Sequence, residues 1–99
     1  PCFTHPVLIT HPETKKRALY VNRLLTREIA GMDQADSRAL LGKLFDVIER
    51  DEFQYDHKWR PGDFVMWDNR CTQHGRTDFD PAERRLLRRL TVTGERPAA

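Results

Sequence analysis

The sequence has no long hydrophobic run, little excess charge and few cysteines. Each of these features argues against one class of protein. No apolar stretch approaches the roughly 20 residues that a membrane-spanning helix requires. The net charge of +2 is too small to indicate nucleic-acid binding by itself. At 99 residues the chain can form at most one small domain with a modest core, which leaves little room for an enclosed site.

The two cysteines, Cys2 and Cys71, have no Cys-x-x-Cys spacing and form no disulfide framework. One disulfide between them stays open as an alternative, but the spacing favours two free thiols in a reducing cytoplasm. No signal peptide or targeting motif is present in the sequence. The chain begins Pro-Cys-Phe without an initiator methionine, so we expect it to be a segment of a longer gene product.

The first half of the chain predicts a hairpin followed by a helix. The β-branched runs at 7–10 and 17–22 are separated by the polar, turn-forming HPETKK, which is typical of a loose hairpin. From 36 to 50 the apolar residues recur at helical spacing and the charged residues lie between them. Asp33 and Asp36 lie where a helix N-terminus favours negative charge and a capping oxygen.

The second half favours β structure. Aromatic and polar residues alternate over 53–59, RPGD at 60–63 has turn composition, and FVMW at 64–67 is typical of a buried strand. The run at 84–93 is ambiguous, although its final Thr-Val-Thr favours a strand. The chain therefore reads as mainly β, with one helix packed against the sheet.

The arginine pairs near the C-terminus allow two interpretations. In a helix, Arg84, Arg85, Arg88 and Arg89 would form one basic stripe that suits phosphate groups. In a strand, Arg85 and Arg89 would share one face, roughly 13 Å apart at about 3.3 Å per residue, a separation that suits two different carboxylates. Composition alone is also compatible with a solvated charge run. Arginine binds carboxylates in a fixed bidentate geometry, so one such side chain is a reasonable anion anchor.

The histidines carry a weak signal when they are considered one at a time. A single histidine near a turn, such as His74, is more often structural than a ligand. His5, His11 and His57 are subject to the same interpretation, and the four have no zinc-site spacing. Asp68 is expected to bind the backbone of the turn that follows it.

Together these motifs resemble the C-terminal part of the taurine/alkylsulfonate and phenoxyacetate dioxygenases, the TauD/TfdA family. The resemblance covers nearly all of 1–99: the HPVLITHPETKKRALYVN hairpin, the helix, the string WRPGDFVMWDNRCTQH, and an arginine eleven residues after its histidine. It implies a double-stranded β-helix, or jelly-roll, of which this chain would be the C-terminal half. The family members are non-haem Fe(II) enzymes that consume 2-oxoglutarate and O₂.

The resemblance also implies roles for individual residues. His74 matches the distal histidine of the two-histidine, one-carboxylate iron site. Arg85 matches the arginine that holds the far carboxylate of 2-oxoglutarate, and Arg89 matches the arginine that meets an anionic substrate. Further residues that we expect to shape the turn or line the pocket are Trp67, Asn69 and Leu25. The implied reaction hydroxylates a small anionic sulfonate, sulfate ester, aryloxy or carboxylic acid and releases succinate and CO₂.

One departure from the family pattern is large. The family's His-x-Asp/Glu pair is absent: His5, His57 and His74 are followed at the second position by other residues, and HPE at 11–13 lies in the hairpin loop. The chain thus supplies one of three iron ligands and no complete catalytic set. We expect the missing N-terminal part of the same protein to supply the others, and the sequence leaves homo-oligomer formation open. A basic interaction or nucleic-acid-binding module is the alternative.

Overall fold

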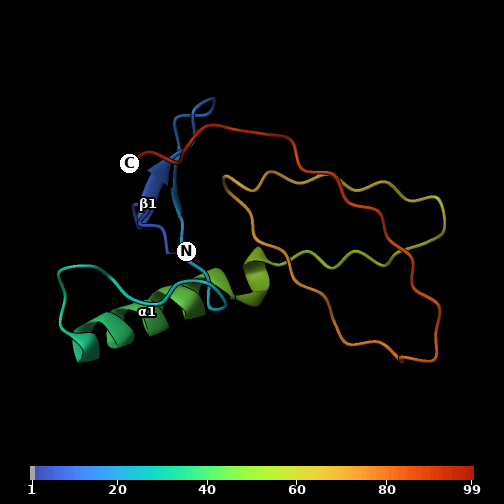
Figure 1. The fold of residues 1–99 in the computed structure, drawn as a ribbon, viewed down its shortest axis with the longest axis horizontal. Helices are drawn as coiled ribbons and strands as arrows, with labels where there is room; N and C mark the ends of the chain where they lie inside the picture. Colours follow the sequence, from blue (N-terminus) through green and yellow to red (C-terminus); the bar gives the residue numbers. More distant parts are fainter. Residues whose placement is uncertain (1) are drawn as a thin grey trace.

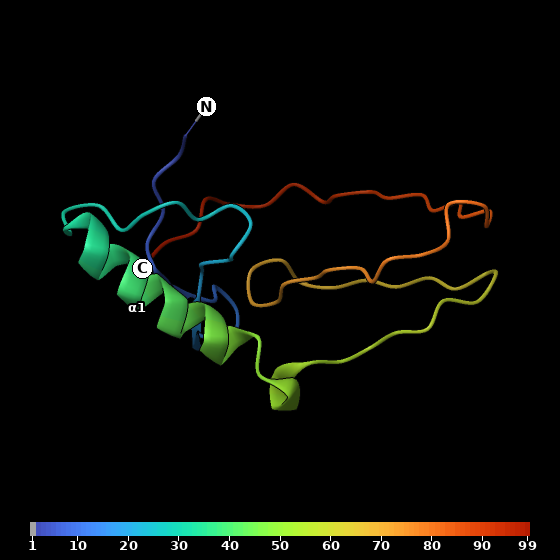
Figure 2. The ribbon, with the colours of Figure 1, turned by 90° about the horizontal axis from the view of Figure 1, so that it is seen from below.

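The computed structural model describes residues 2–99 of the chain. In order, the elements are two short strands, one helix and one turn of 3-10 helix: β1 (Leu8–Thr10), β2 (Arg17–Leu19), α1 (Gln34–Ile48) and η1 (Asp51–Phe53). Beyond η1, the chain leaves this compact part in two long out-and-back excursions, coloured yellow and then orange to red (Figures 1 and 2).

The predicted hairpin and helix are confirmed. β1 and β2 are antiparallel, with Leu8 opposite Leu19 and Thr10 opposite Arg17. The polar residues between them form the turn, in which Lys15 adopts a positive φ of 60°. The carbonyl of Ala98 accepts a hydrogen bond from the Thr10 N–H at 2.9 Å, so the end of the chain returns to β1 (Figure 1).

Helix α1 packs one face against the segment that follows β2. Leu41 and Phe45 are buried together with Val21, and the partly buried hydrophobic residues around them are Val7, Ile29, Leu44 and Ile48. Ser37 is also buried, and its hydroxyl accepts the N–H of Ile29 at 2.8 Å. The predicted capping oxygen is wrong, because Asp33 occupies the N-cap without a side-chain hydrogen bond; Asp36 lies in the first turn as expected.

Arg23 fastens the same segment to the last turns of α1. Its guanidinium pairs with Glu49 at 3.0 Å and with Asp46 at 3.3 Å, and it lies 5.1 Å from the ring centre of Phe45. The Arg23 hydrogen bond lowers the pKa of Glu49 below its ordinary value. These groups are well exposed, so the pair orients the segment more than it stabilises the fold.

The strands predicted within 53–59, 64–67 and 84–93 are wrong for the described residues, which contain only β1 and β2 as strands. A strand exists only where its backbone pairs with a neighbour, and these extended segments have no ladder hydrogen bonds. Their apolar side chains are left exposed, and the most exposed are Tyr55, Phe64, Met66, Leu90 and Val92. The expected predominance of β structure is therefore not observed, and the jelly-roll stays a prediction.

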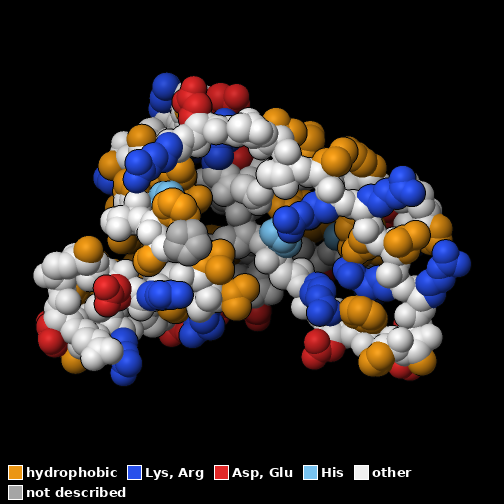
Figure 3. Space-filling model, in the orientation of Figure 1, with side chains coloured by type: hydrophobic (Ala, Val, Ile, Leu, Met, Phe, Trp, Pro, Cys, Tyr) orange, Lys and Arg blue, Asp and Glu red, His pale blue; other side chains and the backbone are white. Residues whose placement is uncertain are grey.

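The arginine-rich run is not helical either. Residues 84–93 contain no helix, so the basic helical stripe required by a nucleic-acid-binding module is wrong. In Figure 3 the Lys and Arg side chains of this part lie scattered among exposed hydrophobic side chains instead of forming one continuous basic surface. No helix in residues 2–99 is both long and apolar enough to cross a membrane.

Candidate functional site

The turn that precedes His74 is organised by Asp68. The Asp68 carboxylate accepts the main-chain N–H of Arg70 at 2.9 Å and two guanidinium N–H groups of Arg70, at 2.9 and 2.8 Å. The Asp68 carbonyl accepts the N–H groups of Cys71 and Thr72 and the Thr72 hydroxyl, the last at 2.7 Å. The turn-forming role predicted for Asp68 is confirmed.

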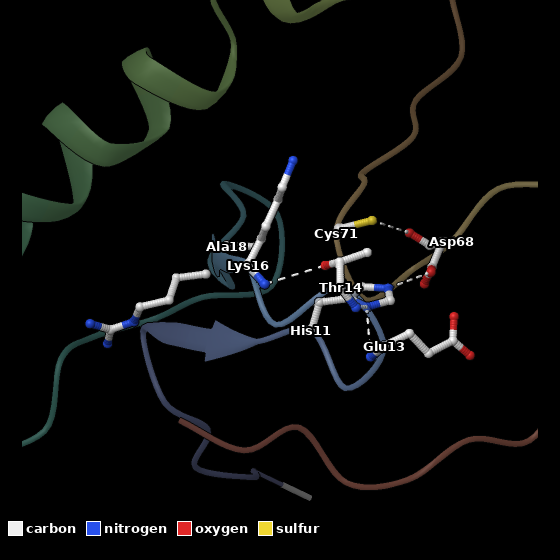
Figure 4. A pocket seen from close by; sticks show the side chains of 8 residues that line it. His11, Glu13, Thr14, Lys16, Ala18, Asp68 and Cys71 are labelled. Carbon is white, nitrogen blue, oxygen red and sulfur yellow. Dashed lines mark hydrogen bonds and ion pairs between the residues drawn. The ribbon is translucent and has the colours of Figure 1, made fainter.

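Asp68 has a second charge-stabilising partner in the hairpin. Nε2 of His11 lies 2.9 Å from Asp68 Oδ2, although 57 positions separate the two residues (Figure 4). Hydrogen bonds hold the pKa of Asp68 well below its usual range. The largest effect comes from the Arg70 side chain, followed by the His11 side chain and then the main-chain N–H of Arg70. The carboxylate is therefore ionised wherever the protein is folded at ordinary pH.

The turn is fastened to the hairpin at its other end as well. The side-chain amide of Gln73 donates a hydrogen bond to the main-chain carbonyl of Val21, one of the core residues. Asp68 thus attaches the segment 68–73 to the turn after β1, and Gln73 attaches it to Val21, two residues after β2. His74 is the next residue in the chain.

His74 is exposed and contacts one of the predicted site residues. Its ring lies 4.6 Å from the ring of Trp67, with the planes inclined by 42°. The indole N–H of Trp67 donates to Asn69 Oδ1 at 2.9 Å, so these two residues are joined within the turn. Within residues 2–99 the His74 imidazole has no hydrogen-bond or ion-pair partner. An imidazole nitrogen that no protein group occupies can supply its lone pair to a divalent iron ion.

Arg85 lies in a different local environment. Its guanidinium lies 5.1 Å from the ring centre of Phe79, and Arg76 lies at the same distance from that ring. In the described part of the chain neither Arg85 nor Arg89 pairs with a carboxylate, whereas Arg23 and Arg70 do. A guanidinium held by an aromatic face keeps its N–H groups available, so Arg85 fits the binding of a free carboxylate.

The predicted site residues are only partly brought together. Trp67, Asn69 and His74 form one contact group, but among residues 2–99 no hydrogen bond, ion pair or ring contact joins His74 to Arg85 or Arg89. Leu25 is exposed on the segment after β2. Asn69 also borders a shallow hollow that is lined in addition by Tyr20, Arg70, Thr91 and Val92.

A second hollow surrounds His11 and contains residue types that can bind metals. One ligand atom each from His11, Asp68 and Cys71 lies within 4.8 Å of the others. Both imidazole nitrogens of His11 are already engaged, because Nδ1 accepts the N–H groups of Glu13 and Thr14 (Figure 4). The Arg70 cation is 2.8 Å from the Asp68 carboxylate and repels a further cation. The group therefore acts as a hydrogen-bonded clamp and not as a metal centre.

His11 is the residue that the sequence motifs did not single out. Its partner lies far along the chain, and no local pattern marks a histidine in a hairpin turn as the partner of a distant aspartate. The prediction of two free thiols is confirmed, since Cys2 and Cys71 are both unpaired and exposed.

Comparison with known proteins agrees with these motifs. The family model described as "Taurine catabolism dioxygenase TauD, TfdA family" matches residues 1–91. The chain belongs to the TauD/TfdA family. The match spans the hairpin, α1, the first excursion and the second as far as residue 91, so the turn at 67–74 and the arginines at 84–89 lie within the TauD/TfdA region.

Individual TauD/TfdA relatives are similar over almost the whole chain. Pentalenolactone F synthase of Streptomyces avermitilis is 42% identical over 95% of this chain. An alkylsulfatase of Acinetobacter baylyi is 40% identical over 92%. An alpha-ketoglutarate-dependent 2,4-dichlorophenoxyacetate dioxygenase of Burkholderia sp. is 36% identical over 97%. The matches cover 31%, 28% and 32% of these proteins, so the chain spans about a third of their length. No solved structure matches the chain.

Proposed function

We propose that this chain is the C-terminal segment of an Fe(II)- and 2-oxoglutarate-dependent dioxygenase that hydroxylates a small anionic organic substrate. Family membership supports the proposal, as do relatives whose names specify alpha-ketoglutarate dependence or action on phenoxyacetates. The relatives also include an alkylsulfatase and a sulfonate dioxygenase, which supports a sulfonate, sulfate ester, aryloxy acid or carboxylic acid as the substrate class.

The observation that carries the proposal is the environment of His74. Its imidazole follows a turn that is held at Asp68 and at Gln73 and contacts the ring of Trp67, but in the described residues it has no hydrogen-bond or ion-pair partner. A metal ligand requires one imidazole nitrogen that no protein group occupies, on a side chain whose orientation is restricted. When bound, the iron would supply activation of O₂ for oxidation of an unreactive C–H bond.

The chain's own contribution is to bind and orient charged groups. His74 would supply one of the three iron ligands. Arg85, resting on Phe79 without an acidic partner, would neutralise the far carboxylate of 2-oxoglutarate. Arg89 would meet the anionic group of the substrate. If the longer protein pairs this segment as a strand, side-chain alternation would place Arg85 and Arg89 on the same face.

The remaining iron ligands would come from the rest of a longer protein. The relatives are about three times as long as this chain, and no His-x-Asp or His-x-Glu pair in the family register is present here. That additional part would also cover the apolar side chains left exposed on the two excursions, such as Phe64 and Leu90. We place the protein in the cytoplasm, where its two free thiols stay reduced.

The test uses the longer protein that carries this segment together with its upstream residues. Succinate formation is measured with Fe(II), 2-oxoglutarate and candidate sulfonates, sulfate esters and aryloxy acids. We expect His74→Ala to abolish turnover and Fe(II) binding. His5→Ala is the matched control, because His5 is also exposed and also makes one aromatic contact, with Tyr20. Full activity in His74→Ala would refute the ligand assignment.

A further inference from the structure

His11 is a buried polar residue that the proposed chemistry does not use. It lies in the turn after β1 and is one of two buried polar residues in the described part of the chain, with Ser37 the other. Ser37 is explained by its hydrogen bond across the core. His11, in contrast, points out of the hairpin toward the turn that begins at Asp68 (Figure 4).

The hydrogen bonds of His11 indicate which tautomer its neutral ring adopts. Nδ1 faces the main-chain N–H groups of Glu13 and Thr14, each at 3.2 Å, and can only accept from them. The neutral ring therefore carries its proton on Nε2, which donates to Asp68 Oδ2 at 2.9 Å. One imidazole thus closes the hairpin turn with one nitrogen and holds Asp68 with the other.

Asp68 transmits this restraint toward His74. The same carboxylate accepts hydrogen bonds from Arg70, and the Asp68 carbonyl accepts from Cys71 and Thr72, so a displacement of Asp68 moves the whole turn. Trp67, the residue before Asp68, is in ring contact with His74. Through a single carboxylate, His11 is therefore connected to the turn that leads to His74 and, by way of Trp67, to the His74 ring.

We propose that His11 is a positioning residue for His74, and that it acts by clamping the 67–74 turn to the β1–β2 hairpin through Asp68. The proposal rests on the proposed function, in which His74 binds iron. It assigns His11 no contact with iron or substrate. Groups that orient a metal ligand from outside the coordination sphere contribute to metal affinity because they remove alternative ligand orientations.

Two substitutions of His11 separate its hydrogen bonds to Glu13 and Thr14 from its hydrogen bond to Asp68. In His11→Asn the side-chain oxygen can take the place of Nδ1 and close the hairpin turn, but the side chain is too short to reach Asp68. In His11→Gln the amide nitrogen can take the place of Nε2 and donate to Asp68, but the acceptor for Glu13 and Thr14 is lost. The pair therefore distinguishes the clamp from the turn itself.

The experiment measures Fe(II) affinity and the KM for 2-oxoglutarate in the longer protein, with unfolding temperature recorded for each variant. We expect His11→Asn to weaken Fe(II) binding by about tenfold. At saturating iron the KM for 2-oxoglutarate should be unchanged. We expect His11→Gln to retain most of the Fe(II) affinity even if its unfolding temperature falls.

The outcomes are decisive in each direction. Wild-type Fe(II) affinity in a folded His11→Asn protein would overturn the proposal. So would a result in which both variants lose iron affinity only in proportion to lost stability, because His11 would then be merely structural. His74→Ala is measured in parallel: if that variant binds Fe(II) normally, the proposed function fails, whatever His11 does.

Discussion

The rings of Trp67 and His74 are in contact, with centroids 4.6 Å apart, and the indole N–H of Trp67 is held by Asn69. Trp67 therefore restricts the His74 ring, while the Asp68 turn restricts the backbone that leads to it. Such a double restraint is expected of a metal ligand, whose orientation must be set before the metal arrives.

Removing the ring of Trp67 should loosen His74. Aromatic contacts contribute about 0.5–1.5 kcal/mol, so Trp67→Ala should weaken Fe(II) binding in the longer protein by roughly 2- to 10-fold. Trp67→Phe keeps a ring and should lose less. Trp59→Ala is the matched control, since Trp59 lies edge-on to His57 at 5.0 Å in a similar pair. Equal losses in the Trp59 and Trp67 variants would contradict the prediction.

Arg85 should determine the affinity for 2-oxoglutarate. A hydrogen bond to a charged group contributes about 1.5–3 kcal/mol, so Arg85→Ala should raise the KM for 2-oxoglutarate by roughly 10- to 100-fold. Arg88→Ala removes the same side chain three positions away, which would lie on the opposite face of a strand, and should change this KM little. Steady-state kinetics with varied 2-oxoglutarate measures both; a larger effect at Arg88 would reverse the assignment of the faces.

The small core should make the fold sensitive to Leu41. Its side chain is 3% exposed, so Leu41→Ala should lower the free energy of unfolding by about 2–5 kcal/mol. Leu40 is the same residue type one position earlier, at 39% exposure, and Leu40→Ala should cost much less. Urea unfolding followed by circular dichroism compares the two variants. Similar losses would show that α1 packs through a different face.

Asp68 should contribute to acid sensitivity. Its folded-state pKa is lowered by the Arg70 and His11 hydrogen bonds. The contribution to stability is therefore fully present above the unfolded-state pKa of about 3.9 and is lost as pH falls through the folded-state value. Asp68→Asn should flatten the dependence of unfolding free energy on pH below about pH 4. Asp56→Asn is the control, because Asp56 is exposed and has no ion pair in the described residues. An unchanged slope in Asp68→Asn would contradict the prediction.

The two excursions should gain protection in the longer protein. In this chain the segments 64–67 and 86–92 have no ladder hydrogen bonds, so their amides should exchange with solvent almost freely. If the rest of the protein supplies neighbouring strands, exchange at these amides should slow strongly. The amides of Leu41 and Phe45 in α1 are the internal reference. Identical exchange of the excursions in both proteins would show that nothing pairs with them.

Local sequence patterns were sufficient to predict the elements whose formation depends on residues close in the sequence. The spacing of Leu41 and Phe45 predicted α1, and the β-branched runs around HPETKK predicted the hairpin, because both patterns reflect backbone periods of a few residues. The role of Asp68 in its turn followed from the preference of aspartate for nearby N–H groups. The family motif also placed Trp67 beside the histidine that it contacts.

Only the folded chain could join residues that are distant in sequence. Alternation over 53–59 and the β-branched Thr-Val-Thr at the end of 84–93 favoured strands, but a strand needs a partner backbone, and local sequence carries no record of one. The pairing of His11 with Asp68 spans 57 positions, and it arises because the hairpin turn and the turn at 67–74 meet in space. A hydrogen bond depends on distance and direction between atoms, so this contact was settled by tertiary packing and not by the residue types alone.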